Sequence, residues 1–203
     1  MRIRKSKDES LLIIFYKNPE LGKVKTRLAA TIGDAKAYAI YLLLSEHTRS
    51  ITEKLPMSKA LYYSDFIDHN DSWHNEKYQK HLQMGGDLGE KMMNAFRDGF
   101  KNGYQSICII GTDCLELTPQ VVKEGFRKLH THDIVVGPAH DGGYYLLGMN
   151  YLHPALFQNK SWSTNRVLAE TLHDIKLLGL TYRQLDTLND IDEEKDLPPH
   201  FRT

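Results

Sequence analysis

The stretch Ser106-Ile107-Cys108-Ile109-Ile110-Gly111-Thr112-Asp113 joins a short apolar run to a small polar loop. The apolar part is rich in isoleucine, which is typical of a central strand in a parallel sheet that is covered on both faces. Thr118–Leu129 follows with helical length; Thr118 is its expected N-cap and Pro119 its first helical residue. The stretch therefore predicts a strand–loop–helix unit of an α/β protein.

Strands and helices are predicted to alternate along the rest of the chain. We predict further strands at Leu11–Tyr16, Ala60–Tyr63, His81–Met84, Asp133–Val136, Tyr144–Met149 and Leu180–Leu185. We predict further helices at Asp34–Leu55, Asp87–Lys101 and Ser163–Leu178, with Asp34 and Ser163 as N-caps. Such alternation predicts an α/β fold whose sheet is mostly parallel.

Length and composition favour one soluble domain that covers residues 1–203. Lys plus Arg and Asp plus Glu number 26 each, and this balance argues against nucleic acid or an anionic membrane as a partner. Two cysteines, Cys108 and Cys114, suit a reducing compartment. The polar start MRIRKSKDES and the short apolar run after it form no targeting signal, so we expect a cytoplasmic protein. Homodimer formation is left open.

Polar loops follow four of the predicted strands. They span residues 17–27, 111–114, 138–143 and 189–196. Because ligands of open α/β sheets bind outside the carboxyl ends of the strands, we expect these loops to share one rim and to form a site.

The first of these loops combines a glycine with several cations. Gly22 allows a tight bend, and Lys17, Lys23, Lys25 and Arg27 surround it. In an extended segment, alternating cations share one face and suit a di- or triphosphate. The pattern is not a Walker A loop. A solvated basic turn is the alternative.

The second loop places a carboxylate directly after a buried strand. Asp113 is our first candidate for holding a hard divalent cation such as Mg²⁺ or Mn²⁺, with Glu116 as a weaker second. The alternative is that Asp113 only caps a turn. Cys114 is interpreted as a small structural residue, because the sequence identifies no particular histidine as its neighbour.

The two later loops supply glycines and further carboxylates. Asp141 could accept hydrogen bonds from donor hydroxyls or act as a base, and Gly142 and Gly143 could bring the backbone close to a sugar; a plain hairpin turn is the alternative. In the acidic tail, Asp192 or Asp190 could complete the metal site, whereas a solvated acidic stretch explains the same residues.

Six blocks of the chain resemble, in the same order, the DUF2064 family of GT-A-like transferases. They are Lys17-x-Pro-x-x-Gly-Lys-Val-Lys-Thr-Arg-Leu28, Gly86-Asp-Leu-Gly-Glu-Lys-Met92, Gly111-Thr-Asp-Cys114, Gly137-Pro-x-x-Asp-Gly-Gly-Tyr-Tyr145, Trp162-Ser-Thr164 and Asp190-Ile-Asp-x-x-x-Asp-Leu197. The resemblance spans roughly residues 11 to 197. More distantly, the basic loop is similar to that of phospholactate guanylyltransferase.

The resemblance implies a GT-A (nucleotide-diphospho-sugar transferase) fold, a Rossmann-like three-layer sandwich with a mostly parallel mixed sheet. It also implies that Asp113 and Asp192 hold Mg²⁺ or Mn²⁺, that the basic loop covers the donor phosphates, and that Asp87 contributes to donor binding. Leu115 and the pair Glu193-Glu194 depart from the family pattern, and neither departure removes an implied ligand.

Two reactions fit these expectations. The leading one is glycosyl transfer from a nucleoside diphosphate sugar to a small-molecule acceptor, with Asp113, Asp141 and Lys25 as catalytic residues. The alternative is nucleotidyl transfer, in which a phosphorylated acceptor attacks a nucleoside triphosphate and releases pyrophosphate; no protein nucleophile is then needed. A nucleotide-binding module without turnover is a third class.

Overall fold

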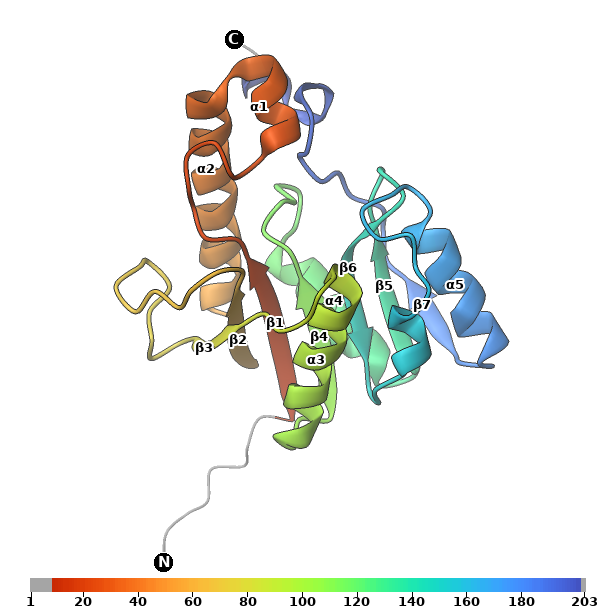
Figure 1. The fold of residues 1–203 in the computed structure, drawn as a ribbon. Coiled ribbons are helices and arrows are strands. Elements are labelled where there is room, and N and C mark those ends of the chain that lie inside the picture. The colour runs from red at the N-terminus through yellow and green to blue at the C-terminus, as the bar shows by residue number, and fades with distance from the viewer. Residues whose placement is uncertain (1–8, 202–203) are drawn as a thin grey trace, which may run out of the picture.

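The computed structural model describes residues 9–201, which form one seven-stranded mixed sheet with helices on both faces (Figure 1). Residues 1–8, where we expect no targeting signal, lie outside the described residues, as do 202 and 203. The strands are β1 (Ser10–Tyr16), β2 (Ser58–Tyr63), β3 (Gln79–Leu82), β4 (Ser106–Ile110), β5 (Ile134–Pro138), β6 (Tyr144–Met149) and β7 (Tyr182–Gln184).

The strand order β3-β2-β1-β4-β6-β5-β7 confirms a mostly parallel sheet. β1 pairs in parallel with β2 and β4, and β5 pairs in parallel with β7. Among the strands of the described residues, only β6 runs the other way, because it returns from β5 through a tight turn and inserts beside β4. The predicted strands exist, and β4 and β6 have the predicted bounds; β3 begins and ends two residues earlier than expected.

The helices complete three layers. They are α1 (Thr26–Ile32), α2 (Asp34–Glu53), α3 (Leu88–Lys101), α4 (Pro119–Leu129) and α5 (Val167–Leu177), with short 3₁₀ turns η1 (Pro154–Phe157), η2 (Glu194–Asp196) and η3 (Pro199–Phe201). One core cluster joins the sheet to α2 and α4, and the other joins it to α3, η1 and α5. The helix α1 was not predicted; its first two residues, Thr26 and Arg27, lie in the stretch interpreted as a loop.

The side chains of β1 alternate between the two faces of the sheet, and this shows why helices must cover both faces. Leu12 and Ile14 belong to the core cluster on the α2 and α4 side, whereas Leu11 and Ile13 belong to the cluster on the other side. All four side chains are buried. Complete burial of such a side chain contributes about 1.5–3 kcal/mol, so the central strand is held equally from both layers.

The helix starts test the capping predictions. Thr118 caps α4 as expected, because its Oγ1 accepts a hydrogen bond of 3.3 Å from the amide of Val121. Asp34 is wrong as an N-cap: Gly33 holds that position and Asp34 lies in the first turn. Ser163 is also wrong, because it adopts a left-handed backbone (φ 61°) and α5 begins only at Val167.

Within residues 9–201, the helices are all too short or too polar to cross a lipid bilayer.

Candidate functional site

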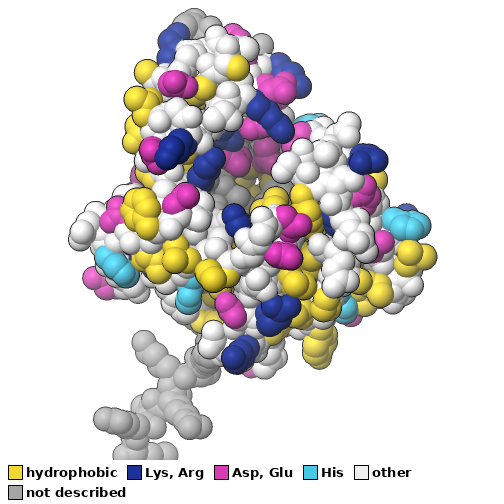
Figure 2. Space-filling model, viewed as in Figure 1, with side chains coloured by type: hydrophobic (Ala, Val, Ile, Leu, Met, Phe, Trp, Pro, Cys, Tyr) yellow, Lys and Arg dark blue, Asp and Glu magenta, His cyan; other side chains and the backbone are white. Residues whose placement is uncertain are grey.

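The carboxyl ends of β1, β4, β5 and β7 point to the same edge of the sheet, so the prediction of one shared rim is confirmed. Isolated bridges link the loops there: Cys114 pairs with Asp190, and Ala139 pairs with Leu188. In the space-filling view this edge is hollowed below α1, and basic and acidic side chains gather around the hollow (Figure 2).

Three carboxylates from different loops interact electrostatically at this edge. Asp190 is largely buried, and burial, followed by repulsion from Asp113 and Asp141, raises its pKa to about 7. Its Oδ1 is buried and, among the described residues, has no hydrogen-bond partner. The nearby charge of Lys25 compensates an ionised Asp190 only in part, which favours a bound cation or a bound proton there.

Packing of the last segment explains how Asp190 reaches this position. Ile191 is buried in a small core cluster with Leu28 of α1 and Leu44 of α2. Because successive side chains of an extended segment alternate, burial of Ile191 turns Asp190 and Asp192 to the opposite side. The tail thus presents its carboxylates to the basic loop.

Lys25 supplies the cation closest to Asp113. Its Nζ lies 2.6 Å from Asp113 Oδ1, and its side chain is only 6% exposed, against 46% for Asp113. Lys25 has a left-handed backbone (φ 49°) and is the N-cap residue of α1. Since such a conformation is costly outside glycine, the helix start holds this lysine against its local preference.

Arg27 faces the second tail carboxylate. Its guanidinium nitrogen donates to Asp192 Oδ2 at 2.7 Å, and both side chains are well exposed. An ion pair in this setting contributes about 1 kcal/mol or less, so a ligand phosphate could replace Asp192 as the partner at little cost. Asp190, rather than Asp192, is the tail carboxylate that interacts with Asp113.

The expectation that the loop cations share one face of an extended segment is wrong, because residues 21–25 form turns and α1 begins at Thr26. Lys17 donates to the carbonyl of Lys23 at 2.6 Å. Lys23 pairs with Glu20 at 2.8 Å on the surface. The sharp turn between them uses a positive φ of 78° at Gly22, as a glycine there predicts.

Two residues that sequence reasoning missed hold the basic loop. Tyr41 of α2 donates from its hydroxyl to the carbonyl of Lys17, and burial raises the pKa of this phenol, so the hydroxyl stays a donor. Asn18 Oδ1 accepts from the amides of Asp65 and Phe66 at 3.0 and 3.3 Å. The Asn18-Pro19 dipeptide is a local signal of a turn at this position.

The glycine pair after β5 forms a hairpin turn packed against its own chain. Gly142 has a positive φ of 87°, and a Cβ there would overlap the backbone of Asn165. Asp141 Oδ1 accepts from the amide of Gly143 at 2.8 Å. The backbone of Gly142 therefore approaches residue 165, which explains this glycine without a bound sugar. The carboxylate of Asp141 is exposed toward the rim.

Two other acidic candidates have local partners. Asp87 Oδ1 caps α3 by accepting from the amide of Glu90 at 2.8 Å. Glu116 Oε2 accepts from the amide of Asn189 at 2.9 Å and so fixes the start of the tail. These contacts explain both residues without a ligand.

The carboxylate oxygens at the rim fit a hard divalent cation. Within residues 9–201, no three His, Cys, Asp or Glu side chains are arranged as a complete metal cage. Mg²⁺ commonly uses only one or two protein carboxylates and takes its other ligands from phosphates and water. Asp113 and the unpartnered oxygen of Asp190 match that requirement.

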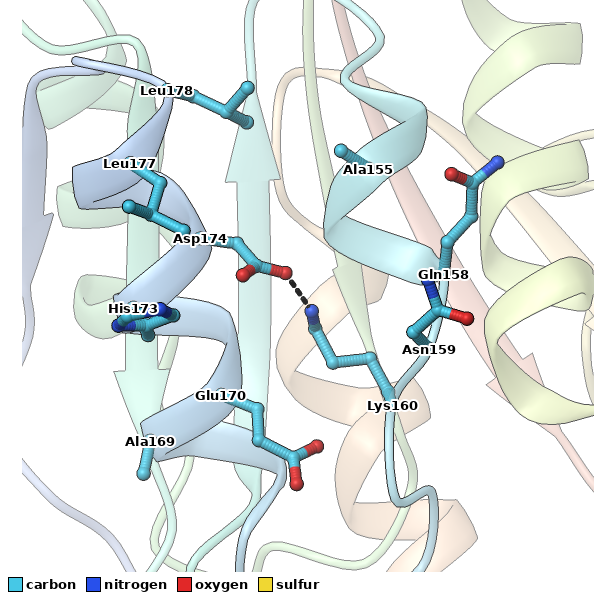
Figure 3. A pocket seen from close by; sticks show the side chains of 10 residues that line it. All are labelled: Ala155, Gln158, Asn159, Lys160, Ala169, Glu170, His173, Asp174, Leu177 and Leu178. Atoms are coloured by element: carbon cyan, nitrogen blue, oxygen red, sulfur yellow. Dashed lines mark hydrogen bonds and ion pairs between the residues drawn. The ribbon is translucent and has the colours of Figure 1, made fainter.

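A separate groove lies between η1 and α5 (Figure 3). Its volume is about 650 Å³, and its main charged contact is the ion pair of Lys160 with Asp174. The lysine is almost completely buried and its charge is neutralised within the pair. None of the predicted site residues lines this groove, so the rim remains the candidate site.

Comparison with known proteins finds one family model and several solved structures that are similar to this chain. The profile of the family described as "Uncharacterized protein conserved in bacteria (DUF2064)" matches residues 47–164. None of the curated proteins matches. A crystal structure from Desulfovibrio desulfuricans G20, provisionally named a nucleotide-diphospho-sugar transferase, is 30% identical with a TM-score of 0.85; the match covers 93% of this chain and 84% of that one.

More distant structures share the fold. A 4-diphosphocytidyl-2C-methyl-D-erythritol synthase has a TM-score of 0.56 at 10% identity, with 94% of this chain and 95% of that one covered. The inositol-1-phosphate CTP transferase from T. maritima has a TM-score of 0.51 at 13% identity, with 97% and 94% covered. At such identities the likeness shows the fold and nothing of the reaction.

Proposed function

The chain belongs to the DUF2064 family, and from that premise we propose that it is a metal-dependent transferase acting on a nucleotide-activated donor. The observation that carries the proposal is the meeting of Asp113, Asp190 and Lys25 at the carboxyl edge of the sheet. Carboxylates beside cations on such an edge suit a donor whose phosphates need both a metal and basic side chains.

Each rim residue has a role in this proposal. Asp113 and Asp190 would hold Mg²⁺ or Mn²⁺, which, when bound, neutralises the charge that develops on the departing phosphate. Lys25 and Arg27 would bind the same phosphates; Arg27 offers two parallel donors and Lys25 a point charge. Tyr41 and Asn18 would keep the loop in place through contacts to its backbone and to the neighbouring loop.

We propose glycosyl transfer as the reaction. The bond between the anomeric carbon and the diphosphate oxygen breaks, and the nucleoside diphosphate leaves with the bonding electrons. An acceptor hydroxyl forms the new carbon–oxygen bond and gives its proton to a base. Asp141 is the candidate base, because its carboxylate is exposed on the rim and interacts with Asp190. The provisional name of the 30%-identical structure supports the same donor class.

Nucleotidyl transfer is the second candidate. The supporting observation is that two neighbouring cations face carboxylates of the rim, Lys25 at Asp113 and Arg27 at Asp192, which suits the larger charge of a triphosphate. In that reaction an acceptor phosphate attacks the α-phosphorus and pyrophosphate leaves, so positioning and charge neutralisation suffice.

One pair of assays separates the two reactions. Nucleoside diphosphate sugars are screened by thermal shift with Mg²⁺, because a ligand that binds the native state raises Tm. Nucleoside triphosphates are screened for pyrophosphate release with phosphorylated acceptors. Stabilisation by a nucleotide sugar without any pyrophosphate release supports glycosyl transfer. Acceptor-dependent pyrophosphate release would replace it with nucleotidyl transfer.

A further inference from the structure

The ammonium group of Lys25 stands at the carboxylates that the proposed metal needs. Its Nζ lies 2.6 Å from Asp113 Oδ1, and its charge also lowers the pKa of Asp190, which burial and then repulsion from neighbouring carboxylates otherwise raise. At 6% exposure the lysine side chain is shielded from water. Attraction and repulsion around it are therefore weakly screened.

A divalent cation at Asp113 and Asp190 would meet this buried positive charge. Two outcomes are physically distinct. Lys25 could hold Asp113 in the orientation that the metal requires, in which case its removal weakens metal binding. Alternatively, Lys25 could compete with the metal for the same carboxylates, in which case its removal strengthens metal binding.

We propose that Lys25 is an internal counter-ion that holds the carboxylates of Asp113 and Asp190 until a divalent cation and the donor phosphates arrive together. This inference rests on the proposed function, and it adds that the metal and the donor phosphates bind cooperatively. The metal alone binds weakly, because it takes the carboxylate partner of Lys25 and then lies beside an ammonium group whose charge is no longer neutralised. Phosphates supply that anion, so each ligand strengthens the binding of the other.

The geometry favours competition over support. Lys25 is anchored by its left-handed backbone at the start of α1, whereas its long side chain can turn from Asp113 toward a phosphate without moving that helix. Arg27, two residues later, has an exposed side chain, and its exposed partner Asp192 is easily replaced. Lys25 and Arg27 could then share the incoming phosphates.

The experiment measures Mn²⁺ binding to the full chain by electron paramagnetic resonance in the absence of any phosphate compound. Lys25→Met should bind Mn²⁺ about tenfold more tightly than the unmodified protein. Lys160→Met is the matched control: it removes another buried lysine that pairs with an aspartate, in the groove between η1 and α5, and should leave Mn²⁺ affinity unchanged. Circular dichroism confirms that each variant is folded.

A second measurement uses thermal shift with Mn²⁺, with inorganic pyrophosphate, and with both. In the unmodified protein the shift with both ligands should exceed the sum of the separate shifts, and in Lys25→Met the excess should largely disappear. Equal or weaker Mn²⁺ binding in Lys25→Met, with Asp113→Asn still abolishing it, would overturn the counter-ion role and leave the metal site intact. Absence of Mn²⁺ binding in every protein, even with pyrophosphate, would overturn the metal site and this inference together.

Discussion

The backbone amide of Ile191 donates a hydrogen bond of 2.9 Å to the carbonyl of Asp113, and this contact ties the acidic tail to the loop after β4. The neighbouring bridge between Cys114 and Asp190 continues the same pairing. Two carboxylates distant in the sequence are thus held together by main-chain contacts, although their charges repel each other. A site built on backbone pairing is better ordered than one that depends on loop tips alone.

Replacement of Asp113 tests the metal site. Asp113→Asn removes one negative charge and keeps the shape, so the gain in nucleotide affinity caused by Mg²⁺ should be lost. Isothermal titration with and without Mg²⁺ measures it. Glu124→Gln, a surface change in α4, is the control, because Glu124 pairs with Arg127 and Lys128 of its own helix. Unchanged Mg²⁺ dependence in Asp113→Asn would remove this residue from the metal site.

Asp190→Asn should stabilise the metal-free protein at pH 8. The folded protein retains a proton on Asp190 up to a pKa of about 7, whereas the unfolded chain releases it near pH 4. Its stability therefore falls as pH rises through this window, and the loss persists above it. The asparagine variant avoids the loss, so its Tm advantage should grow between pH 4 and 7 and then level off.

The same variant should lose the rise in Tm that Mn²⁺ causes. A residue that destabilises the free protein yet is needed for a ligand fits a functional position. Thermal unfolding across pH, with and without Mn²⁺, measures both effects. Asp192→Asn is the comparison and should keep the Mn²⁺ response. A lower Tm for Asp190→Asn at pH 8 would show that this carboxylate serves the fold instead.

Arg27→Lys should weaken donor binding while metal affinity changes little. The change keeps the charge and removes the forked pair of donors, so we expect about tenfold weaker binding of the donor. Fluorescence titration with a nucleotide ligand identified in the screen measures it. Arg127→Lys, on the surface of α4, should have no effect. Equal loss in both variants would indicate an effect of surface charge in general.

Tyr41→Phe should loosen the basic loop without altering the metal ligands. The lost hydrogen bond to the carbonyl of Lys17 contributes about 1 kcal/mol. We expect a comparable loss of unfolding free energy and a reduced kcat/KM, with Mn²⁺ affinity retained. Denaturant unfolding and steady-state kinetics test this pair of effects. A variant with unchanged kcat/KM would limit Tyr41 to a structural role.

Gly89→Ala tests the contact between α3 and the segment before α5. A Cβ at Gly89 would overlap the indole ring of Trp162, so the substitution should cost about 1–3 kcal/mol. Trp162→Ala in the same chain should remove most of that additional cost. Urea unfolding of the two single variants and the double variant gives the coupling energy. Additive effects would show that the two residues do not restrain each other.

The central strands were predicted well from the sequence because they are short, β-branched apolar runs bounded by polar loops. β4 and β6 match their expected bounds, and the rim follows from the strand directions. The turns at residues 21–25 and the start of α1 at Thr26 were not predicted, because alternating cations do not indicate where a turn or a helix begins. Local propensity likewise assigned Ser163 to a cap, whereas packing against Gly142 and Gly89 keeps that segment irregular.

The candidate site was predicted only in outline. Asp113 followed from its place after a buried strand, but Asp190 and Asp192 stood equal in the sequence. The burial of Asp190 and its repulsion from Asp113 and Asp141 decide between them, whereas Asp192 is exposed and pairs with Arg27, and all of this depends on contacts remote in the chain. Tyr41 and Asn18 escaped notice for the same reason: each acts through a hydrogen bond to another segment's backbone.

The most direct test of the central claim is the anomalous scattering of Mn²⁺ in crystals grown with Mn²⁺ and pyrophosphate. The proposed site predicts a single strong peak within coordination distance, about 2.2 Å, of carboxylate oxygens of both Asp113 and Asp190, with the ammonium of Lys25 turned toward the pyrophosphate. A peak bound to other residues, with Lys25 still on Asp113, would contradict it.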